Sequence, residues 1–533
     1  MIHMTGERRG TFRFFLVISG ICLGAAAACC AEPPKVGEII FTADFEAAGV
    51  LDAWPGRAGA VGLDAGFKSA RGLAIESTNA ARGAYVQIPL PAKRLRGCKL
   101  ILVGDVRASD VSRRPASWNG IKFMTPITGA SGGKWWPQAQ LGVGTFGWRR
   151  VAWHAMVPKD AERMVLHLGL ERVTGKVWFD NIKVAVRRPP AAPTARKHTG
   201  PAYKGHNLPR LRGAMVSTRA TPDDLRTFGR DWKANLIRWQ LFGFKPRFDT
   251  GDLKEYDRRL AEELKKLDAA LPVCREVGLM VVVDLHTGPG HWAQGERGLF
   301  ANAACQKRFV EIWQHIARKY KDVKCIWGYD LLNEPLENSV SEDVADWQEL
   351  AERAARAIRK IDPTRAIIVE PAPWGGPGAL EQLRPLDVPN VVYSVHMYIP
   401  HQFTHQGVHN RNDKPLRYPG VIGGRKWDKA ALERALKPAI EFQKTHGVHI
   451  FLGEFSAIRW APDGSALRYI RDCIEIFEKY RWDWTYHAFR EWSGWSVEHT
   501  SDRADTRPAK QPTARQKLLL EWFSRNRKPT WPR

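Results

Sequence analysis

The stretch LMVVVDLH, residues 279–286, is an apolar run that ends in polar side chains at Asp284 and His286. Such a run is typical of a parallel strand buried on both faces of its sheet. The residues before it predict an amphipathic helix, because apolar side chains recur at spacings of three and four at Leu253, Tyr256, Leu260, Leu264, Leu267 and Leu271. Pro272 is expected to kink or end that helix.

Seven further strand-like runs lie around this unit, several of them separated by amphipathic stretches. They are LRGAMVS at 211, LIRWQ at 236, IWGYDLLNE at 326, AIIVEPAPW at 366, VVYSVHMY at 391, HIFLGEFS at 449 and WTYHAFREW at 484. Eight buried strands with helices between them predict a (β/α)8 TIM barrel, placed at residues 205–525.

The region before the barrel has a different pattern. Residues 36–186 contain short alternating runs such as KLILVGDVRA and KVWFDNIKV, with Gly, Pro, Ser and Asn between them. This pattern predicts an all-β domain, a β-sandwich or jelly roll. The segment RRPPAAPTARKHTGP, residues 187–201, has no periodicity and is expected to be an extended linker.

The N-terminus has the pattern of a signal peptide. Arg8, Arg9 and Arg13 precede an uncharged run from Phe14 to Ala31 whose apolar part is short and gives way to Ala and Cys. We expect residues 1–31 to be removed and the protein to be secreted, periplasmic or on the cell surface, without a transmembrane span in the mature chain. A lipid anchor at Cys29 or Cys30 stays open.

Cysteine use and charge limit the other possibilities. Five cysteines would remain after cleavage: Cys98, Cys274, Cys305, Cys325 and Cys473. They are expected to be mostly buried, with one or two bridges possible.

The chain has 81 Lys and Arg against 56 Asp and Glu, a net charge of +25, which would suit a polyanionic partner. The basic residues are mostly scattered and no nucleic-acid motif accompanies them, so we favour a solvated surface and expect no nucleic acid.

Polar residues gather where the predicted barrel strands end, which is where barrel enzymes place their catalytic groups. They are Arg238, His286, Asn333, Glu334, His396, Tyr398 and Glu454, with Trp492 after the eighth strand. Glu334 and Glu454 come from the fourth and seventh strands, which face each other across a barrel mouth. Glycoside hydrolysis uses such a pair, one carboxylic acid to protonate the departing oxygen and one carboxylate to attack or to activate water.

Six segments together resemble glycoside hydrolase family 5, the cellulase-like family of retaining barrels. They are NLIRW (235–239), DLH (284–286), GYDLLNEP (328–335), SVHMY (394–398), LGEFS (452–456) and the aromatic segment 482–495. The resemblance implies that Glu334 is the acid/base and Glu454 the nucleophile, and that neither a metal nor another cofactor is needed.

The same resemblance implies supporting roles for five further residues. Asn333 would bind the sugar 2-OH and Arg238 would hold the nucleophile, which Tyr398 would also reach with its hydroxyl. His286 and His396 would line the catalytic subsite. One departure is that His487 stands near the position where the family has a Trp platform, so we assign that role to Trp492.

Aromatic residues suggest further sugar contacts. Trp118, Trp135 and Trp136 lie in Gly- and Ser-rich surroundings of the first domain, whose two ends resemble carbohydrate-binding jelly rolls. Aromatics assigned to barrel loops are expected to form stacking subsites in part: Trp239, Trp292, Trp374, Trp427 and Trp460.

Taken together, the sequence predicts a monomeric, secreted retaining β-glycosidase that acts within a β-1,4-glucan, with the first domain helping to hold it on the polymer. A β-mannanase or another β-glycan hydrolase of the same family is the alternative. A barrel that binds carbohydrate without catalysis is a hypothesis of another class, and the presence of both glutamates and their supporting residues argues against it.

Overall fold

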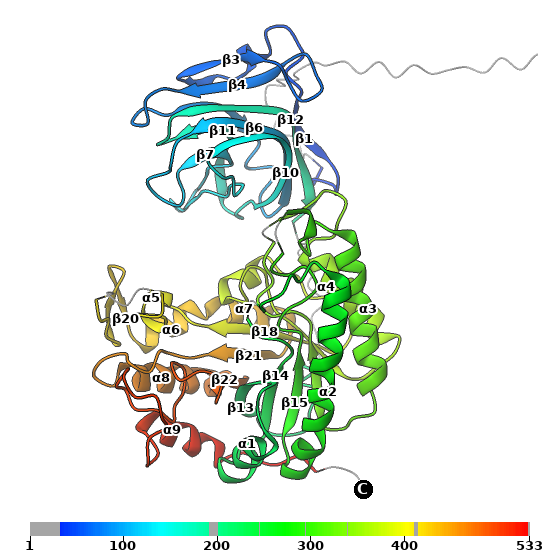
Figure 1. The fold of residues 1–533 in the computed structure, drawn as a ribbon, viewed down its shortest axis with the longest axis vertical. Coiled ribbons are helices and arrows are strands. Elements are labelled where there is room, and N and C mark those ends of the chain that lie inside the picture. Colours follow the sequence, from blue (N-terminus) through cyan, green and yellow to red (C-terminus); the bar gives the residue numbers. More distant parts are fainter. Residues whose placement is uncertain are drawn as a thin grey trace, which may run out of the picture.

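The computed structural model describes residues 32–190, 201–244, 246–293, 295–337, 339–409 and 414–530. A β-rich N-terminal domain lies above a barrel that is surrounded by helices (Figure 1). The predicted signal peptide, with Cys29 and Cys30, and residues 191–200 of the predicted linker lie outside the described residues. Within the described part of the chain, no helix is long and apolar enough to cross a membrane.

The C-terminal domain is a closed barrel of eight parallel strands, which confirms the predicted fold class. In their order around the barrel the strands are β13 (Arg212–Ser217), β14 (Leu236–Gln240), β15 (Met280–Asp284), β16 (Ile326–Asp330), β17 (Ala366–Val369), β18 (Val391–Met397), β21 (Ile450–Phe455) and β22 (Asp483–Phe489). Pairing of β13 with β22 closes the barrel. The carboxyl ends of all eight strands therefore meet at one mouth.

Helices pack around the barrel, and a small hairpin lies in the connection after β18. The helices are α1 (Pro222–Arg226), α2 (Leu253–Val277), α3 (Ala303–Tyr320), α4 (Trp347–Arg359), α5 (His401–Thr404), α6 (Lys429–Ala435), α7 (Lys437–His446), α8 (Ser465–Lys479) and α9 (Ala514–Phe523); the hairpin is β19 (Gly420–Ile422) and β20 (Arg425–Trp427). The Asp252 carboxylate caps the start of α2 by accepting from the N–H groups of Lys254 and Glu255.

Of the two outcomes expected at Pro272, a kink or an end of the helix, the end is wrong. Helix α2 continues past Pro272 to Val277 and stops at Gly278, which has a φ of 70°. The residues after the proline, Val273 and Cys274, are buried against the barrel. This packing outweighs the one backbone hydrogen bond that a proline removes from a helix.

The N-terminal domain consists of two antiparallel six-stranded sheets. One sheet contains β1 (Ile39–Ala43), β3 (Ala60–Asp64), β4 (Gly72–Ser77), β6 (Lys99–Val111), β10 (Gly144–Met156) and β12 (Gly175–Arg188); the other contains β2 (Gly56–Ala58), β5 (Ala84–Leu90), β7 (Gly120–Met124), β8 (Ile127–Gly129), β9 (Lys134–Trp135) and β11 (Ala161–Glu171). Side chains of both sheets share one apolar core, for example Leu102 of β6 and Leu166 of β11. The domain is thus a β-sandwich, and its identity as a jelly roll stays a prediction.

The five cysteines in the described residues are all free and buried, which confirms the main expectation for them and leaves no bridge among them. Burial raises the pKa of the Cys98, Cys305 and Cys325 thiols to about 11. The thiols are therefore protonated at neutral pH and act as small core side chains.

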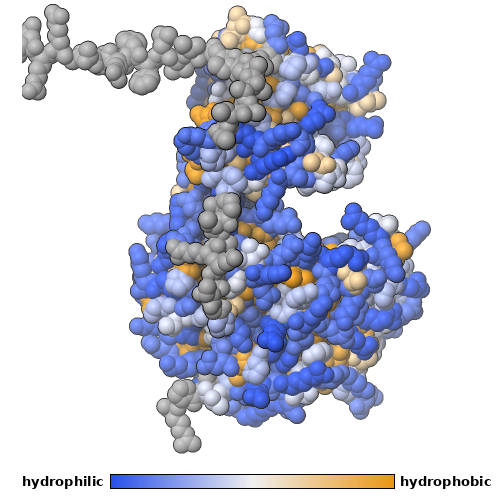
Figure 2. Space-filling view, turned by 180° about the vertical axis from the view of Figure 1, so that it is seen from behind, coloured by the Kyte–Doolittle hydropathy of each residue, from blue (hydrophilic) through white to orange (hydrophobic). Residues whose placement is uncertain are grey.

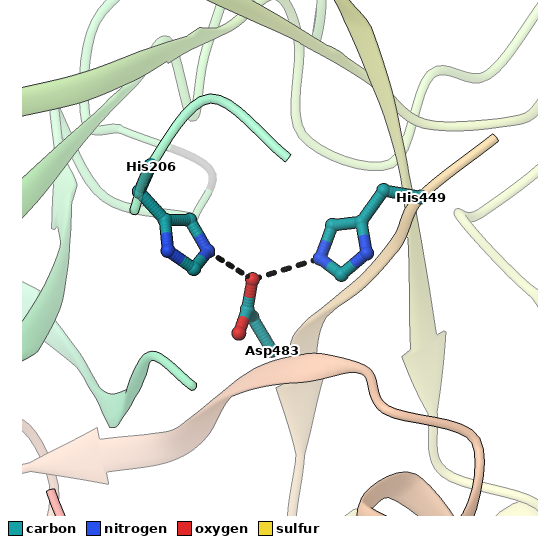
Figure 3. Close-up of side chains that lie close together, drawn as sticks. All are labelled: His206, His449 and Asp483. Atoms are coloured by element: carbon teal, nitrogen blue, oxygen red, sulfur yellow. Dashed lines mark hydrogen bonds and ion pairs between the residues drawn. The ribbon is translucent and has the colours of Figure 1, made fainter. Parts of the chain in front are cut away.

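A buried triad joins three chain segments at the amino ends of the barrel strands (Figure 3). The Asp483 carboxylate, at the start of β22, accepts from Nε2 of His206 and from Nε2 of His449, both at 2.7 Å, and from the Leu211 N–H at 2.7 Å. Because a carboxylate only accepts, both imidazoles donate here, and neither offers these nitrogens to a metal. The triad ties the segments before β13 and β21 to β22.

Replacing Asp483 with Asn should lower the free energy of unfolding by about 3 kcal/mol, because buried donors lose their charged acceptor. Burial opposes ionisation of Asp483, yet the two histidines hold its pKa well below the usual range. Its stabilisation is thus complete above the unfolded pKa of about 4 and declines as the pH falls further. Denaturant unfolding at pH 7 and pH 3 should show a difference that shrinks at the lower pH.

The matched control is Asp463→Asn, which breaks an exposed pair with Arg417. This variant should change the unfolding free energy by less than about 1 kcal/mol. An Asp483→Asn protein as stable as the wild type at pH 7 would contradict the structural role of the triad.

Candidate active site

The polar residues predicted at the strand ends meet at the barrel mouth. Arg238 lies in β14, His286 just after β15, Asn333 and Glu334 after β16, His396 in β18, Tyr398 after it, and Glu454 in β21. One carboxylate oxygen of Glu334, one of Glu454 and a ring nitrogen of His396 all lie within 4.8 Å of one another. The two carboxylates thus face each other across a small gap in which His396 contacts both.

Glu454 is held on both oxygens. Its Oε1 accepts from Nη1 of Arg238 at 2.7 Å, and its Oε2 accepts from the Tyr398 hydroxyl at 2.8 Å. Burial would raise the pKa of Glu454, but the positive charges of His396, His487 and Arg238 outweigh burial and hold that pKa well below its usual range. Glu454 is therefore ionised at neutral pH, as an attacking carboxylate must be.

Glu334 has the opposite environment. Its Oε1 is 2.8 Å from Nδ1 of His396, and its backbone N–H donates to Glu370 at 2.8 Å. Burial raises the pKa of Glu334 above its usual value, and the charges of Glu454 and Glu370 add to the effect while His396 opposes it. Two neighbouring carboxyls with pKa values pushed apart in this way can divide the roles of acid and anion.

Arg238 is the hub that arranges the site. It is fully buried and donates from Nε to Asp330 at 2.8 Å, from Nη2 to Glu370 at 2.8 Å and from Nη2 to Asn333 at 3.1 Å. The bond to Asn333 uses the amide oxygen and so directs the amide NH₂ group away from Arg238. Asn333 can then donate to a substrate hydroxyl.

Sequence reasoning missed three buried acids around this hub. Glu370 directly follows β17 and links Arg238 to the backbone of Glu334, while its Oε1 lies 3.1 Å from Nε2 of His396. Asp330 and Asp284 end β16 and β15, and Asp284 also contacts Nδ1 of His286 at 2.8 Å. The signal was present as an acidic residue at the end of each apolar strand, and such a carboxylate needs a cation or hydrogen-bond donors beside it once it is buried.

His487 occupies the position on the eighth strand beside the proposed nucleophile. Its Nδ1 is 3.3 Å from Oε2 of Glu454 and contacts the Tyr398 hydroxyl, and its Nε2 is 3.0 Å from Glu491. Burial would lower the pKa of His487, but Glu454 and Glu491 raise it above the usual value. The surroundings of His487 thus favour its protonated form, next to Glu454.

Trp492 lies outside this cluster. Its ring packs edge-on against Trp460 and Trp495 and is 42% exposed. Trp495 is the tryptophan of this segment that packs against both Tyr398 and His487, with ring centroids 6.1 and 5.8 Å away. The platform role assigned to Trp492 stays a prediction, and His487 and Trp495 are nearer to Glu454 and its partners.

The expectation that Trp239 lies in a substrate-binding loop is wrong. Trp239 belongs to β14 and is buried in the layer between barrel and helices. Successive strand residues point to opposite faces, so Arg238 inside the barrel places Trp239 outside it. Of the other aromatics named with it, Trp374 is 44% exposed, and Trp292, Trp427 and Trp460 are half-buried.

Replacing His487 with Gln removes a group that lowers the pKa of Glu454. The pKa of Glu454 should rise, so the acidic limb of the kcat/KM profile should move to higher pH, with a loss on the order of tenfold at neutral pH. A pH profile on a soluble oligosaccharide measures both effects. An acidic limb that stays in place would argue that His487 carries no charge in the free protein.

A parallel barrel with two opposed glutamates of divergent pKa at its carboxyl mouth is the arrangement that O-glycosyl hydrolases use. Residues 198–497 match the family model described as Cellulase (glycosyl hydrolase family 5). The chain belongs to this family, as its motifs predicted.

Several known proteins are similar to the barrel. "Endoglucanase C" of Acetivibrio thermocellus is 31% identical over 258 residues, which span 44% of this chain and 72% of that protein. "Cellodextrinase A" of Ruminococcus flavefaciens is 26% identical over 261 residues, 47% of this chain and 73% of that protein. A solved structure of Cel5A of Thermotoga maritima with mannotriose is 27% identical, covers 59% of this chain and 97% of its own, and has a TM-score of 0.45.

Proposed function

We propose that the protein is a secreted retaining endo-β-1,4-glucanase that works by double displacement with Glu334 and Glu454. The observation that carries the proposal is the pair itself. One oxygen of each carboxylate lies within 4.8 Å of an oxygen of the other. This close approach supports direct attack, for which the carboxyl groups are about 5 to 5.5 Å apart, over an intervening water, for which they are about 6.5 to 9.5 Å apart. The similarity to Endoglucanase C and Cellodextrinase A supports a β-glucan substrate.

In the first step, an oxygen of ionised Glu454 forms a bond to the anomeric carbon while the glycosidic C–O bond breaks. Protonated Glu334 gives its proton to the departing oxygen, so the leaving sugar departs as a neutral alcohol. Asn333 would donate to the 2-OH of the bound sugar, a contact that strengthens as positive charge develops on the ring.

In the second step, Glu334 accepts a proton from water as the water oxygen attacks the anomeric carbon and the bond to Glu454 breaks. Arg238 and the Tyr398 hydroxyl stabilise the Glu454 carboxylate that is released. Each step inverts the anomeric centre once, so the product has the configuration of the substrate. The mechanism needs only the side chains of this chain.

The test is product analysis on cellulose, mixed-linkage glucan, xyloglucan, mannan and xylan. Hydrolysis of a β-1,4-glucan with a rapid fall in viscosity and with the β-anomer as the first product by NMR is expected. An α-anomer as first product would overturn the retaining mechanism. Hydrolysis of mannan alone would replace glucan by mannan as the substrate.

Secretion belongs to the same proposal and rests on the basic start and short apolar run within residues 1–31. Expression of the full gene in a bacterial host should release a chain whose first residue lies between Cys29 and Glu32, as measured by N-terminal sequencing. A lipid on the first residue of the mature chain would show an anchored form, and an uncleaved chain in the cytoplasm would overturn secretion. We expect the mature enzyme to be a monomer.

A further inference from the structure

A large hollow separates the two domains. Its volume is about 1320 Å³, and side chains of both domains line it. Figure 2 shows the surface notched between the upper and the lower lobe, with mostly hydrophilic residues around the notch. The barrel wall of the hollow includes Leu336 and Glu337, which follow Glu334 in the chain, and Ala372 and Pro373, which follow Glu370. The hollow thus begins beside the segments that carry the proposed acid/base.

Exposed aromatic rings line this hollow on the sandwich side, and another lies on the barrel in the segment that follows Pro373. On the sandwich, Trp135 is 36% and Trp136 is 60% exposed, and both line it. On the barrel, Trp374 directly follows Pro373, is 44% exposed, and donates its backbone N–H to the carbonyl oxygen of Pro335 at 3.3 Å. The Trp374 ring lies 6.4 Å from that of Trp292, centroid to centroid. Exposed indole rings along a polar groove are suited to stack on successive sugar rings.

The sandwich is fixed to the barrel at the acid/base side by buried charges. Lys99 of β6 donates from Nζ to both oxygens of Glu337 at 2.8 and 2.7 Å and to Asp346 at 2.9 Å. Nδ1 of His154 in β10 is 2.6 Å from Glu337. All four side chains are nearly buried where the domains meet, so each charge is paired with a charge of the other domain out of contact with water. A binding module tethered only by a linker would not need such a contact.

From the hollow, its tryptophans and this fixed contact we infer that the sandwich forms one wall of the substrate cleft. Trp135 and Trp136 bind sugar rings of the β-glycan chain on the leaving-group side of the cleaved bond. This side follows from the chemistry, because the hollow adjoins the segment after Glu334, and the acid sits at the oxygen that departs with the leaving chain. The inference rests on the proposed function. It assigns the sandwich a direct part in binding the chain that is cut, instead of the separate role of holding the enzyme on the polymer.

The test compares the full-length Trp135→Ala/Trp136→Ala double variant with Leu63→Ala. Leu63 is the matched control, because it is an exposed apolar side chain of the sandwich, 37% accessible, that does not line the hollow. The substrates are cello-oligosaccharides of two to six units and an aryl β-cellobioside whose small leaving group cannot reach the sandwich. The double variant should lose about tenfold in kcat/KM on the hexamer and less than about twofold on the aryl substrate. Leu63→Ala should match the wild type on both.

Cleavage products give a second readout, independent of rate. If the leaving-group subsites are weakened, the hexamer should be cut nearer its reducing end, so the main leaving fragment becomes shorter. An unchanged product pattern and an unchanged hexamer rate in the double variant would overturn the inference while the wild-type activity leaves the proposed function standing. A wild-type enzyme that hydrolyses none of these substrates would overturn both.

Discussion

Replacement of Glu454 by Gln should lower kcat on every β-glycan by a factor on the order of 10⁴ or more. The amide has nearly the shape of the carboxylate and can still accept from Arg238 or Tyr398, but it cannot form the glycosyl ester. Rates measured from reducing ends released from a soluble glucan test this. A residual rate within tenfold of the wild type would contradict the assignment of Glu454 as nucleophile.

Two controls separate lost chemistry from a damaged site. Binding of a cello-oligosaccharide to Glu454→Gln, measured by calorimetry, should stay within about tenfold of the wild type, because the subsites are intact. Thermal unfolding should change little, since the buried Arg238 keeps contacts with Asp284, Asp330 and Glu370. Loss of binding together with loss of rate would indicate that the substitution disrupts the site.

Glu454 has three basic neighbours. Arg238 pairs with Glu454 and also with Asp284, Asp330 and Glu370. Ring nitrogens of His396 and His487 lie 3.8 and 3.3 Å from Oε2 of Glu454, and together with Arg238 they hold the pKa of Glu454 below its usual range. An imidazole therefore lies beside Glu454 near the position where the family resemblance implied a tryptophan platform.

The sequence predicted the barrel well because its signals are local. An apolar run of five residues, a helix with a period of 3.6 and a polar residue at the strand end each lie within one short window. The same rule that found Arg238 and Glu454 would have found Glu370 at the end of AIIV. Glu370 was not selected because none of the family motifs quoted above includes the segment AIIVEPAPW, so only its place at a strand end pointed to it.

The contact between the domains could not be predicted in this way. Lys99 and Glu337 are 238 residues apart, and nothing near either residue encodes the other. Lys99 is the first residue of a strand whose sequence alternates in the ordinary way, and the sequence around Glu337 is typical of a loop in which an acid is solvated. Their pairing depends on how a whole sheet docks on one barrel loop.

The burial of Trp239 outside the barrel could have been predicted. Arg238 points into the barrel, and the next residue of a strand points to the opposite face.

Replacement of Glu334 by Ala should produce a different defect, which depends on the leaving group. Hydrolysis of a glucan needs a proton for a departing alcohol, so kcat/KM should fall on the order of 10³-fold or more. In an aryl β-cellobioside with an acidic phenol, the phenolate can leave without that proton. Formation of the glycosyl-enzyme from this substrate should therefore be far less affected. The second step then lacks its general base, and the intermediate should accumulate as a burst of phenol followed by slow turnover.

Azide provides the decisive readout for this variant. The small anion fits the space left by the removed carboxylate and attacks the glycosyl-enzyme without a general base, so added azide should speed turnover and yield a β-glycosyl azide. Retained configuration in that product would show that Glu454 had formed its bond to the anomeric carbon on the face opposite to the one that azide attacks. An α-azide, or an equal loss on glucan and aryl substrate without a burst, would contradict the roles proposed for the two glutamates. The wild type under the same azide concentration is the control and should show no acceleration, because its own carboxylate at Glu334 repels the anion.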